Sequence, residues 1–408
     1  MKCRHCSEEL VHTFVDLGSA PPSNAFLSID DLIGVEHWYP LRVWVCEHCW
    51  LVQTEDLVGA ADLFNDEYAY FSSYSESWLE HARRYVESMV AEYDLGPRSH
   101  VVEIASNDGY LLQYVRKQDI PCLGIEPTHS TAGAAREKGI ETLEVFFGTE
   151  IARQIRKSHG AADLAIANNV LAHVPDINDF VGGLAVLLKS TGVATFEFPH
   201  LLNLVESNQY DTIYHEHFSY LSLLAVSNVF KSNGLQIFRV EEVTSHGGSL
   251  RVFAQRADVS HYDIDGSVAY LIAREVAMGL QSITYFKGAQ VRAEKLKNDL
   301  LSFLIGAKQR GETVVGYGAA AKGNTLLNFA GVRSDLLSYV VDKNPAKQNM
   351  YMPGSRIPIV DKGTLENDPP DYVLILPWNI ADEIMQQNSA LTDKGVRFVV
   401  AVPELKVM

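Results

Sequence analysis

Two stretches of this 408-residue chain alternate apolar strand-like runs with helical spacing, and this alternation restricts the possible folds more than any other feature. In the first stretch, which begins near residue 100, the predicted strands are VVEIA, CLGIEP, DLAIANNV and GVATFEFP, with helices over 132–138 and 180–188. FRVEEVT and SLRVFAQR, separated by SHGG, predict a hairpin that completes the sheet. Regular alternation of this kind is typical of a parallel α/β sheet, so we expect a Rossmann-like domain.

The second stretch repeats the pattern in the last third of the chain. Its predicted strands are TVVGYG, LLSYVVDK, DYVLILPW and VRFVVAVP, and a long helical segment over 267–308 precedes them. Residues 70–93 also have helical spacing, whereas residues 1–66 are irregular, bear cysteines and hold only short apolar runs. We therefore expect three domains: a small β-rich module over 1–66, an α/β domain over 67–256 and a second Rossmann-like domain over 257–408.

The composition limits the classes of function. A hydrophobic content of 47% and a charged content of 21% are typical of a soluble globular protein, and no apolar run approaches the roughly 18 residues of a membrane span. The first residues have no apolar segment after their charges, so we expect no secretory signal and a cytoplasmic location. The net charge of −17 argues against nucleic acid as a partner, because phosphate backbones are bound by clustered Lys and Arg.

Four of the five cysteines form two C-x-x-C pairs, which are too few for a disulfide scaffold but suit one metal ion. The pairs are Cys3 with Cys6 and Cys46 with Cys49. Thiolates three residues apart can ligate one tetrahedral Zn²⁺ from a single turn, and a second pair completes its coordination. We therefore predict a structural zinc site without an open position for catalysis. His5 and His48 are alternative ligands, and free thiols or a redox pair are the other interpretations.

The turn after the first strand of the α/β domain predicts a cofactor site. Doubly wound sheets bind ligands at the carboxyl ends of their strands, and Glu103, Ser106, Asn107 and Asp108 fall at that edge. The turn lacks G-x-G-x-x-G, which argues against a dinucleotide, and its short polar side chains suit the amino-acid end of S-adenosylmethionine. Glu126 ends the second strand, where a carboxylate can accept both ribose hydroxyls. The alternatives are simple helix capping and the cofactor site of a sugar-nucleotide dehydrogenase.

Polar side chains also follow the third and fourth strands, at the same carboxyl edge. The third strand ends in Asn168 and Asn169, which we expect to face the cofactor, and His173 lies just beyond them. The fourth strand ends in E-F-P-H, which begins at Glu197. We expect His173 to face the cofactor or the substrate, although a lone histidine is more often a helix cap or a core residue.

The segment I-Y-H-E-H-F-S-Y follows the fourth strand and gathers titratable side chains over the same edge. Histidine is the side chain best matched to taking a proton near neutral pH. A neighbouring carboxylate raises its basicity and fixes its tautomer, and a tyrosine hydroxyl can donate to a developing oxyanion. A metal site is disfavoured because alternate side chains point in different directions and H-E-x-x-H is absent. A purely structural cluster is the remaining alternative.

With these motifs in their order, the whole chain resembles the sugar C-methyltransferases of deoxysugar pathways. The resemblance rests on the two C-x-x-C pairs, E-x-x-x-N-D-G at 103–109, N-N-V-x-x-H-V at 168–174, Y-H-E-H-F-S-Y at 214–220, H-G-G-S-L-R-V at 246–252 and G-Y-G-A-x-A-K-G-N-T at 316–325. It implies a zinc domain, a class I S-adenosylmethionine-dependent domain and a C-terminal Rossmann-like domain. It also implies methyl transfer to C-3 of a nucleoside-diphosphate 4-keto-deoxyhexose, with a dTDP-sugar as the expected substrate. We expect the protein to be a monomer.

The resemblance also implies roles for individual residues of this chain. It makes His217 the base, with Tyr214 and Glu216 beside it and His173 nearby. Such a base would take the proton α to the ketone and leave an enolate carbon as the nucleophile.

The resemblance also implies roles for residues in two regions outside the central motifs. The family places a tyrosine after the zinc module against the methyl donor, which matches Tyr70, with Tyr68 as the weaker match. Tyr74 stands where the family often has a small residue, so the sugar end of the pocket is expected to differ. The family's C-terminal domain helps to hold the sugar nucleotide, which assigns Lys322 and Asn324 to its phosphate or base. Without the resemblance, tight strand–helix packing explains this glycine-rich turn equally well.

Two other functions remain open from the sequence. One is an O- or N-methyltransferase of a small metabolite, which would transfer methyl to a heteroatom without exchange of a substrate C–H proton. The other is a non-catalytic, zinc-bearing sensor of a sugar nucleotide or of the cofactor, which would bind the donor without turnover.

Overall fold

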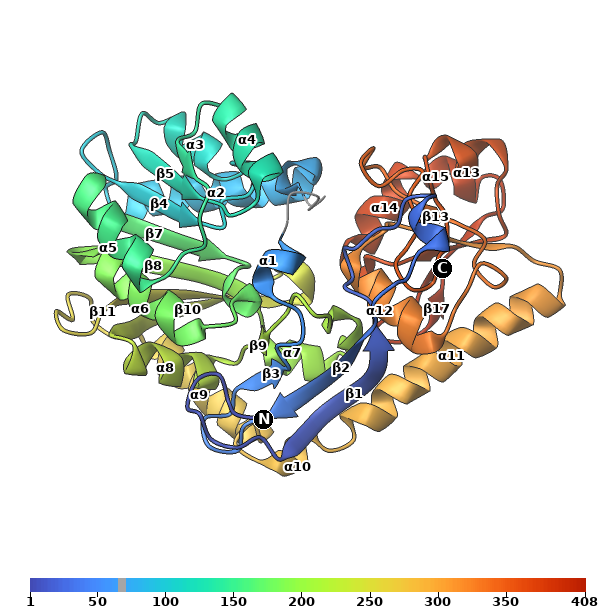
Figure 1. The fold of residues 1–408 in the computed structure, drawn as a ribbon, viewed down its shortest axis with the longest axis horizontal. Coiled ribbons are helices and arrows are strands. Elements are labelled where there is room, and N and C mark those ends of the chain that lie inside the picture. Colours follow the sequence, from blue (N-terminus) through green and yellow to red (C-terminus); the bar gives the residue numbers. More distant parts are fainter. Residues whose placement is uncertain (65–70) are drawn as a thin grey trace.

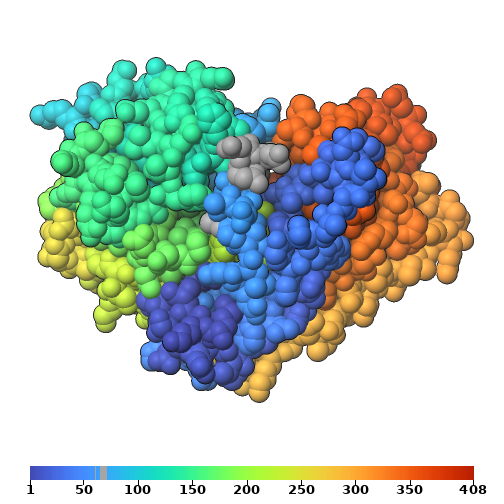
Figure 2. Space-filling view, in the orientation of Figure 1, coloured from blue at the N-terminus to red at the C-terminus, as the bar shows by residue number. Residues whose placement is uncertain are grey.

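The computed structural model describes residues 1–64 and 71–408 of the chain. Figure 1 shows two α/β bodies, joined along one side by the N-terminal strands β1 (His12–Ala20) and β2 (Tyr39–Val45) and by the long helix α11 (Ala289–Gln309). In the space-filling view, the N-terminal residues in blue lie across both bodies (Figure 2). The predicted α/β class with two Rossmann-like sheets is confirmed.

The first α/β body is built on a sheet that has seven strands among the described residues, in the order β10-β11-β8-β7-β4-β5-β6. Strands β4 to β8 run parallel, and β10 and β11 form the predicted antiparallel hairpin at one edge. The strands are β4 (Val101–Ile104), β5 (Cys122–Ile125), β6 (Thr142–Leu143), β7 (Ala162–Asn168), β8 (Leu188–Pro199), β10 (Leu235–Val243) and β11 (Ser249–Arg256). Because the strands are parallel, the polar motifs after β4, β5, β7 and β8 meet at one edge.

Apolar residues bury this sheet on both faces. Side chains alternate along a strand, so Val101 of β4 packs into one core cluster whereas Val102 and Ile104 pack into the other. The helices of this body are α2 (Glu76–Glu92), α3 (Leu112–Arg116), α4 (His129–Glu137), α5 (Thr149–Ser158), α6 (Ile177–Leu187), α7 (Leu201–Glu206), α8 (Leu223–Ser232) and α9 (Gly266–Met278).

Helix α2 shows how a local cap sets an element boundary. Helical spacing predicted a helix over 70–93, but α2 begins only at Glu76, where the hydroxyl of Ser75 accepts a hydrogen bond from the N–H of Trp78. An N-cap of this kind satisfies a backbone N–H that the first turn leaves unpaired. Ala82, Tyr85, Val86 and Met89, which share one face of this helix, are buried.

The second α/β body has the strand order β14-β13-β12-β15-β16-β17. Its strands are β12 (Val314–Tyr317), β13 (Val340–Val341), β14 (Ile359–Val360), β15 (Tyr372–Ile375), β16 (Arg397–Val400) and β17 (Lys406–Val407), and its helices are α12 (Ala321–Ala330), α13 (Gly363–Asn367), α14 (Ala381–Gln387) and α15 (Ser389–Thr392). The helical stretch predicted over 267–308 is divided into α9, α10 (Ile283–Phe286) and α11. Gly279 and Gly288, with φ of 101° and 89°, cause these breaks, because glycine adopts the left-handed region freely.

The N-terminal sheet joins segments that are far apart in the sequence. Its order is β1-β2-β3-β9, where β3 (Val52–Thr54) follows the second cysteine pair and β9 (Ser219–Tyr220) belongs to the Y-H-E-H-F-S-Y motif. A short helix α1 (Ala60–Leu63) and the 3-10 helices η1 (Asp31–Ile33), η2 (Ser72–Tyr74), η3 (Leu171–His173), η4 (Tyr210–Thr212), η5 (Ser245–Gly247) and η6 (Trp378–Ile380) complete the elements. None of the described helices combines the length and the apolar character needed to cross a bilayer.

Candidate active site and metal centre

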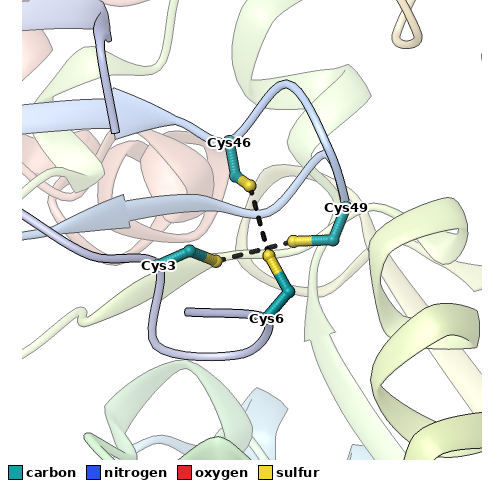
Figure 3. Close-up of side chains that lie close together, drawn as sticks. All are labelled: Cys3, Cys6, Cys46 and Cys49. Atoms are coloured by element: carbon teal, nitrogen blue, oxygen red, sulfur yellow. Dashed lines mark hydrogen bonds between the residues drawn. The ribbon is translucent and has the colours of Figure 1, made fainter. Parts of the chain in front are cut away.

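The four cysteines of the two C-x-x-C pairs converge at one point (Figure 3). Their sulfur atoms lie within 4.8 Å of one another, and the Sγ atoms of Cys3 and Cys49 are 3.5 Å apart, as are those of Cys6 and Cys46. Zn–S bonds of about 2.3 Å in tetrahedral geometry place the sulfurs about 3.8 Å apart, so the cluster has the size and the donors of a zinc site. His5 instead contacts Asn178 through Nδ1 at 2.8 Å. The four thiols fill the coordination, which makes the site structural.

Hydrogen bonds connect the zinc module to the Y-H-E-H-F-S-Y segment. Arg4, inside the first cysteine pair, donates to the carbonyl of Thr54 at 2.8 Å. The hydroxyl of Thr54 donates to the carbonyl of His217 at 3.0 Å, and its N–H donates to the carbonyl of Phe218 at 3.1 Å. Strand β3 therefore connects the metal site to the backbone of the predicted base.

Buried polar atoms without partners gather at the carboxyl ends of β4 and β7. Five buried polar atoms have no hydrogen-bond partner among the described residues: the hydroxyl of Ser106, Oδ1 of Asp108, Oδ1 of Asn168 and both amide atoms of Asn169. An unpaired buried group of this kind destabilises a protein by about 1–3 kcal/mol, so a polar ligand is the natural partner.

The charge of these groups indicates a ligand with a positive charge. Burial raises the pKa of Glu103 well above its usual range, and the neighbouring Asp108 and Glu126 carboxylates add to the rise. A bound cation would favour the ionised carboxylates again. S-adenosylmethionine carries positive charge on its ammonium and its sulfonium, so the residues present fit this cofactor.

Backbone strain coincides with the same edge. Ala105, Asn107 and Asn169 adopt left-handed conformations with φ of 57°, 50° and 52°. This region is unfavourable for residues with a Cβ, although asparagine tolerates it better than most. Strained residues persist where the surrounding structure holds them, and they cluster at functional sites.

Two of the predicted cofactor residues also organise the turns themselves. Oδ1 of Asn107 accepts from the N–H of Ser72 at 2.9 Å. The carboxylate of Glu126 accepts from the N–H of Asn107 at 2.9 Å and from the N–H of Thr128 at 3.0 Å. Glu126 thus joins the turn after β4 to the turn after β5, at the position predicted for the ribose.

A tyrosine after the zinc module is predicted to contact the methyl donor. Tyr70 and its weaker alternative Tyr68 lie outside the described residues, so this contact stays a prediction. The neighbouring Tyr74 is 63% exposed. Trp78, from the first turn of α2, stacks on the ring of Tyr110 with 5.8 Å between centroids. It therefore lies beside the turn that follows β4.

Replacing Glu126 with alanine is expected to weaken S-adenosylmethionine binding about 10- to 100-fold, because charge-assisted hydrogen bonds of a carboxylate contribute about 1.5–3 kcal/mol. Isothermal titration calorimetry measures the Kd. Thr128→Val is the matched control, since it removes a hydrogen bond within the turn and leaves the carboxylate in place. An unchanged Kd in the alanine variant would contradict the assignment of Glu126 to the ribose.

The predicted base, His217, is held in one tautomer. Its Nδ1 donates to the carbonyl of Thr212 at 2.7 Å, so Nε2 carries the lone pair and accepts from the hydroxyl of Tyr214 at 2.7 Å. Burial lowers the pKa of His217 well below its usual range, and electrostatic repulsion from His173 lowers it further. The ring of His173 packs edge-on at 4.6 Å between centroids, as the sequence predicted for a nearby histidine. A neutral imidazole with a fixed lone pair is the arrangement of a general base.

Glu216 points away from this base. Its carboxylate accepts from Nδ2 of Asn24 at 2.7 Å, and burial raises its pKa to about 7. The sequence predicted that a neighbouring carboxylate fixes the tautomer of the base. In the structure the Thr212 carbonyl does so. Residues 214–217 form a turn, closed by the hydrogen bond of 2.9 Å from the His217 N–H to the Tyr214 carbonyl, and Glu216 within this turn is directed toward Asn24. The carboxylate of Glu216 therefore bonds Asn24 rather than the ring of His217, and its catalytic role stays a prediction.

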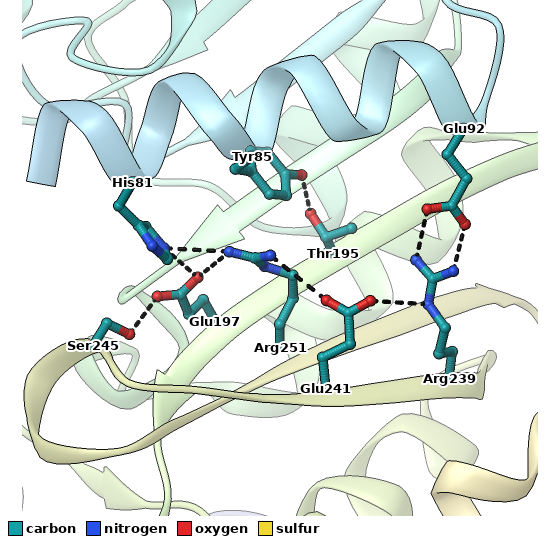
Figure 4. Close-up of polar contacts among 9 residues, drawn as sticks. All are labelled: His81, Tyr85, Glu92, Thr195, Glu197, Arg239, Glu241, Ser245 and Arg251. Carbon is teal, nitrogen blue, oxygen red and sulfur yellow. Dashed lines mark hydrogen bonds and ion pairs between the residues drawn. The ribbon is translucent and has the colours of Figure 1, made fainter.

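A buried ion-pair network under the site was not found from the sequence (Figure 4). Glu197, at the end of β8, accepts from His81 Nε2 at 2.9 Å, from Arg251 at 2.9 Å and from the hydroxyl of Ser245 at 2.6 Å. Burial alone would raise the pKa of Glu197, but these partners outweigh it and hold the pKa at about 2. The sequence placed Glu197 at the carboxyl edge, but its partners come from α2 and from the terminal hairpin.

Lys322, in the first turn of α12, lies where the two α/β bodies meet. Its Nζ donates to Oδ1 of Asn379 at 2.6 Å and lies 4.6 Å from the ring centroid of Trp378. The indole N–H of Trp378 donates to Oδ2 of Asp211 at 2.7 Å. Burial lowers the pKa of Lys322, and the Asp211 carboxylate counteracts this effect. Because Lys322 is also one of the charges that act on His217, it lies on the same side as the predicted base.

Asn324, also in the first turn of α12, is 1% exposed. Its amide N–H donates to the carbonyl of Ser23 at 2.6 Å and so fastens the N-terminal segment to this helix. Its contact with the substrate stays a prediction. Asp342, a further residue of the second α/β body, accepts from the N–H of Ala319 at 2.7 Å and organises the glycine-rich turn.

Solved methyltransferase structures match part of this chain at low identity and low TM-score. The magnesium protoporphyrin IX methyltransferase of Synechocystis PCC 6803 with bound SAM is 16% identical, with a TM-score of 0.33, over 44% of this chain and 82% of its own. An S-adenosylmethionine-dependent methyltransferase of Mesorhizobium loti is 15% identical, with a TM-score of 0.35, over 44% of this chain and 100% of its own. Likeness at this level carries no argument about fold or function.

Family models and a curated relative cover almost the whole chain. The model described as "Putative zinc binding domain" matches residues 3–64, "Methyltransferase domain" matches 78–240, and "C-methyltransferase C-terminal domain" matches 244–403. The C-methyltransferase NovU of Streptomyces niveus is 34% identical over 407 residues, which are 100% of this chain and 96% of NovU. With these domains in the same order, the chain belongs to the sugar C-methyltransferase family and is an S-adenosylmethionine-dependent C-methyltransferase with a structural zinc site.

Proposed function

We propose that this enzyme methylates C-3 of a nucleoside-diphosphate 4-keto-deoxyhexose and that a base-generated enolate of the sugar is the nucleophile. The observation that carries the proposal is the state of His217. Its lone pair is fixed on Nε2, and burial keeps the ring neutral, so the base is ready at neutral pH. Methylation of carbon beside a ketone requires such a base, because the C–H bond must first be ionised.

The residues of this chain divide the reaction between them. Nε2 of His217 removes the C-3 proton, a role that contributes about 10²–10⁴-fold to a rate. The hydroxyl of Tyr214 occupies Nε2 at 2.7 Å, so it gives up this bond as substrate enters and then donates to the keto oxygen. When bound at the edge of β4 and β7, S-adenosylmethionine supplies an electrophilic methyl group. Holding donor and acceptor in line contributes up to about 7–11 kcal/mol.

The similarity to NovU supports a sugar nucleotide as the substrate class. Lys322 brings positive charge to the side of His217 from the C-terminal body, and we assign it to an anionic part of the nucleotide. One chain supplies Lys322, His217 and the cofactor edge, which supports a monomer as the functional unit. We also propose the cytoplasm as its location, where sugar nucleotides and S-adenosylmethionine are both supplied.

Incubation with methyl-labelled S-adenosylmethionine and a panel of dTDP-, UDP- and GDP-linked 4-keto-deoxyhexoses tests the proposal. Mass spectrometry and NMR are expected to locate the label on C-3 of the sugar. Label on oxygen or nitrogen would identify a heteroatom methyltransferase instead. Binding of the donor without label transfer to any sugar would favour the non-catalytic sensor.

A further inference from the structure

His246 is a half-buried histidine that the proposed mechanism leaves unused. It lies in η5 with φ of 54° and ψ of 23°, inside the H-G-G-S-L-R-V motif. This left-handed conformation is unfavourable for a residue with a Cβ, so the surrounding structure must hold it there. The Nδ1 atom is buried and has no hydrogen-bond partner within the part of the chain that the structure describes.

The first α/β body holds the loop around His246 from one side. The hydroxyl of Ser245 donates to Glu197 at 2.6 Å, and the side-chain N–H of Gln209 donates to the carbonyl of Gly247 at 2.9 Å. These bonds fix the backbone immediately before and after the histidine.

The second α/β body holds the same loop from the other side. The indole of Trp378 lies so close to Gly247 that a Cβ there would be 2.5 Å from Cη2. Trp378 is fixed in turn by its hydrogen bond of 2.7 Å to Asp211. Contacts from both α/β bodies therefore hold the backbone of His246 in this conformation. The backbone conformation in turn determines the direction in which the ring points.

The ring of His246 belongs to the same cluster as the base. Its edge packs on the indole of Trp78 at 5.0 Å between centroids, next to the predicted cofactor edge. Lys322 and His173 act electrostatically on His246, and both of them also act on His217. His246 thus packs against Trp78 and lies near enough to His217 to act on it electrostatically, and its Nδ1 is unpaired.

We propose that His246 is a catalytic hydrogen-bond donor to the keto oxygen at C-4 of the sugar, an inference that rests on the proposed function. Nε2 of His217 takes the C-3 proton, and the electron pair of the C–H bond becomes the C-3–C-4 double bond. The π pair of the carbonyl moves onto oxygen, which the Nδ1–H of His246 stabilises together with the hydroxyl of Tyr214. Burial lowers the pKa of His246 to about 4, so the imidazole is neutral near pH 7 and can polarise a carbonyl without giving up its proton.

Solvent deuterium exchange at C-3, measured with S-adenosylhomocysteine in place of the donor, isolates this step from methyl transfer. His246→Gly removes the ring and relieves the backbone strain, so the fold is expected to persist. Exchange is expected to fall about 10²–10³-fold, the loss typical of one oxyanion donor, with the Kd for S-adenosylmethionine and the Tm retained. His246→Asn, which keeps an N–H donor and tolerates the left-handed region, should retain more exchange than the glycine variant. Added imidazole should restore part of the exchange in His246→Gly and leave the wild type unchanged.

Three results would overturn the inference. The first is a glycine variant that exchanges at nearly the wild-type rate. The second is a loss of exchange that imidazole does not rescue and that His246→Asn shares in full, which indicates a purely structural histidine. In the third, the wild type itself exchanges C-3 of no 4-keto-sugar in the panel, so the proposed function fails and the inference fails with it.

Discussion

Replacing His217 with asparagine is expected to lower kcat by about 10²–10⁴-fold and to remove C-3 exchange, because asparagine has no basic nitrogen. Its amide can still donate to the Thr212 carbonyl that holds Nδ1 at 2.7 Å, so the segment should keep its place. The Kd for S-adenosylmethionine should therefore be retained. Single-turnover methylation, deuterium exchange and calorimetry measure the three quantities.

Tyr214→Phe is the control for His217→Asn. It removes one polarising hydroxyl and leaves the base intact, so it should slow turnover less. An asparagine variant that still methylates at nearly the wild-type rate would move the base elsewhere. The next candidate is His173, whose ring lies 4.6 Å from that of His217 and whose pKa burial lowers to about 4.

Cys46→Ser is expected to release the zinc ion, lower the Tm and reduce kcat more than donor affinity. Structural Zn²⁺ contributes about 10–16 kcal/mol in small zinc domains, which makes this the largest stability effect expected for a single substitution here. Leu10 and Leu51 of the zinc module share a core cluster with β4, so its loss exposes apolar surface of the first α/β body. The effect on kcat follows from Thr54, which bonds the backbone of His217 at 3.0 Å. Metal analysis, thermal melts and steady-state kinetics report the outcome.

Two variants separate the effects of zinc loss. Cys122→Ser changes a thiol in β5, away from the cluster, and should retain the metal. Thr54→Val keeps the metal ligands and removes the hydroxyl bond to His217, so it should lower kcat without loss of zinc. Purified wild-type protein that contains no zinc and is fully active would refute the structural role of the metal.

The sequence by itself determined the features that depend on local pattern. Alternation of strand and helix predicted both sheets, because period and polarity decide which segments bury a face. The two C-x-x-C pairs predicted the metal donors, since each pair forms its knuckle within one turn. The sequence also placed Glu103, Glu126 and Asn169 at one edge of the sheet. Each lies near the end of a strand, and neighbouring parallel strands have their carboxyl ends at the same edge.

The tertiary structure alone decided which distant side chains meet. Glu216 accepts a hydrogen bond from Asn24 and not from His217. Glu197 forms ion pairs with side chains of α2 and of the terminal hairpin. Strand β9 joins the sheet of the zinc module. His246 became a candidate only when Trp378, from the other α/β body, was found to hold its loop in a strained conformation. Periodicity records whether a side chain is buried, but the partner of a buried polar group depends on how separate elements pack. That packing is fixed by contacts between residues that lie from 54 to 192 positions apart in the sequence, which no local pattern encodes.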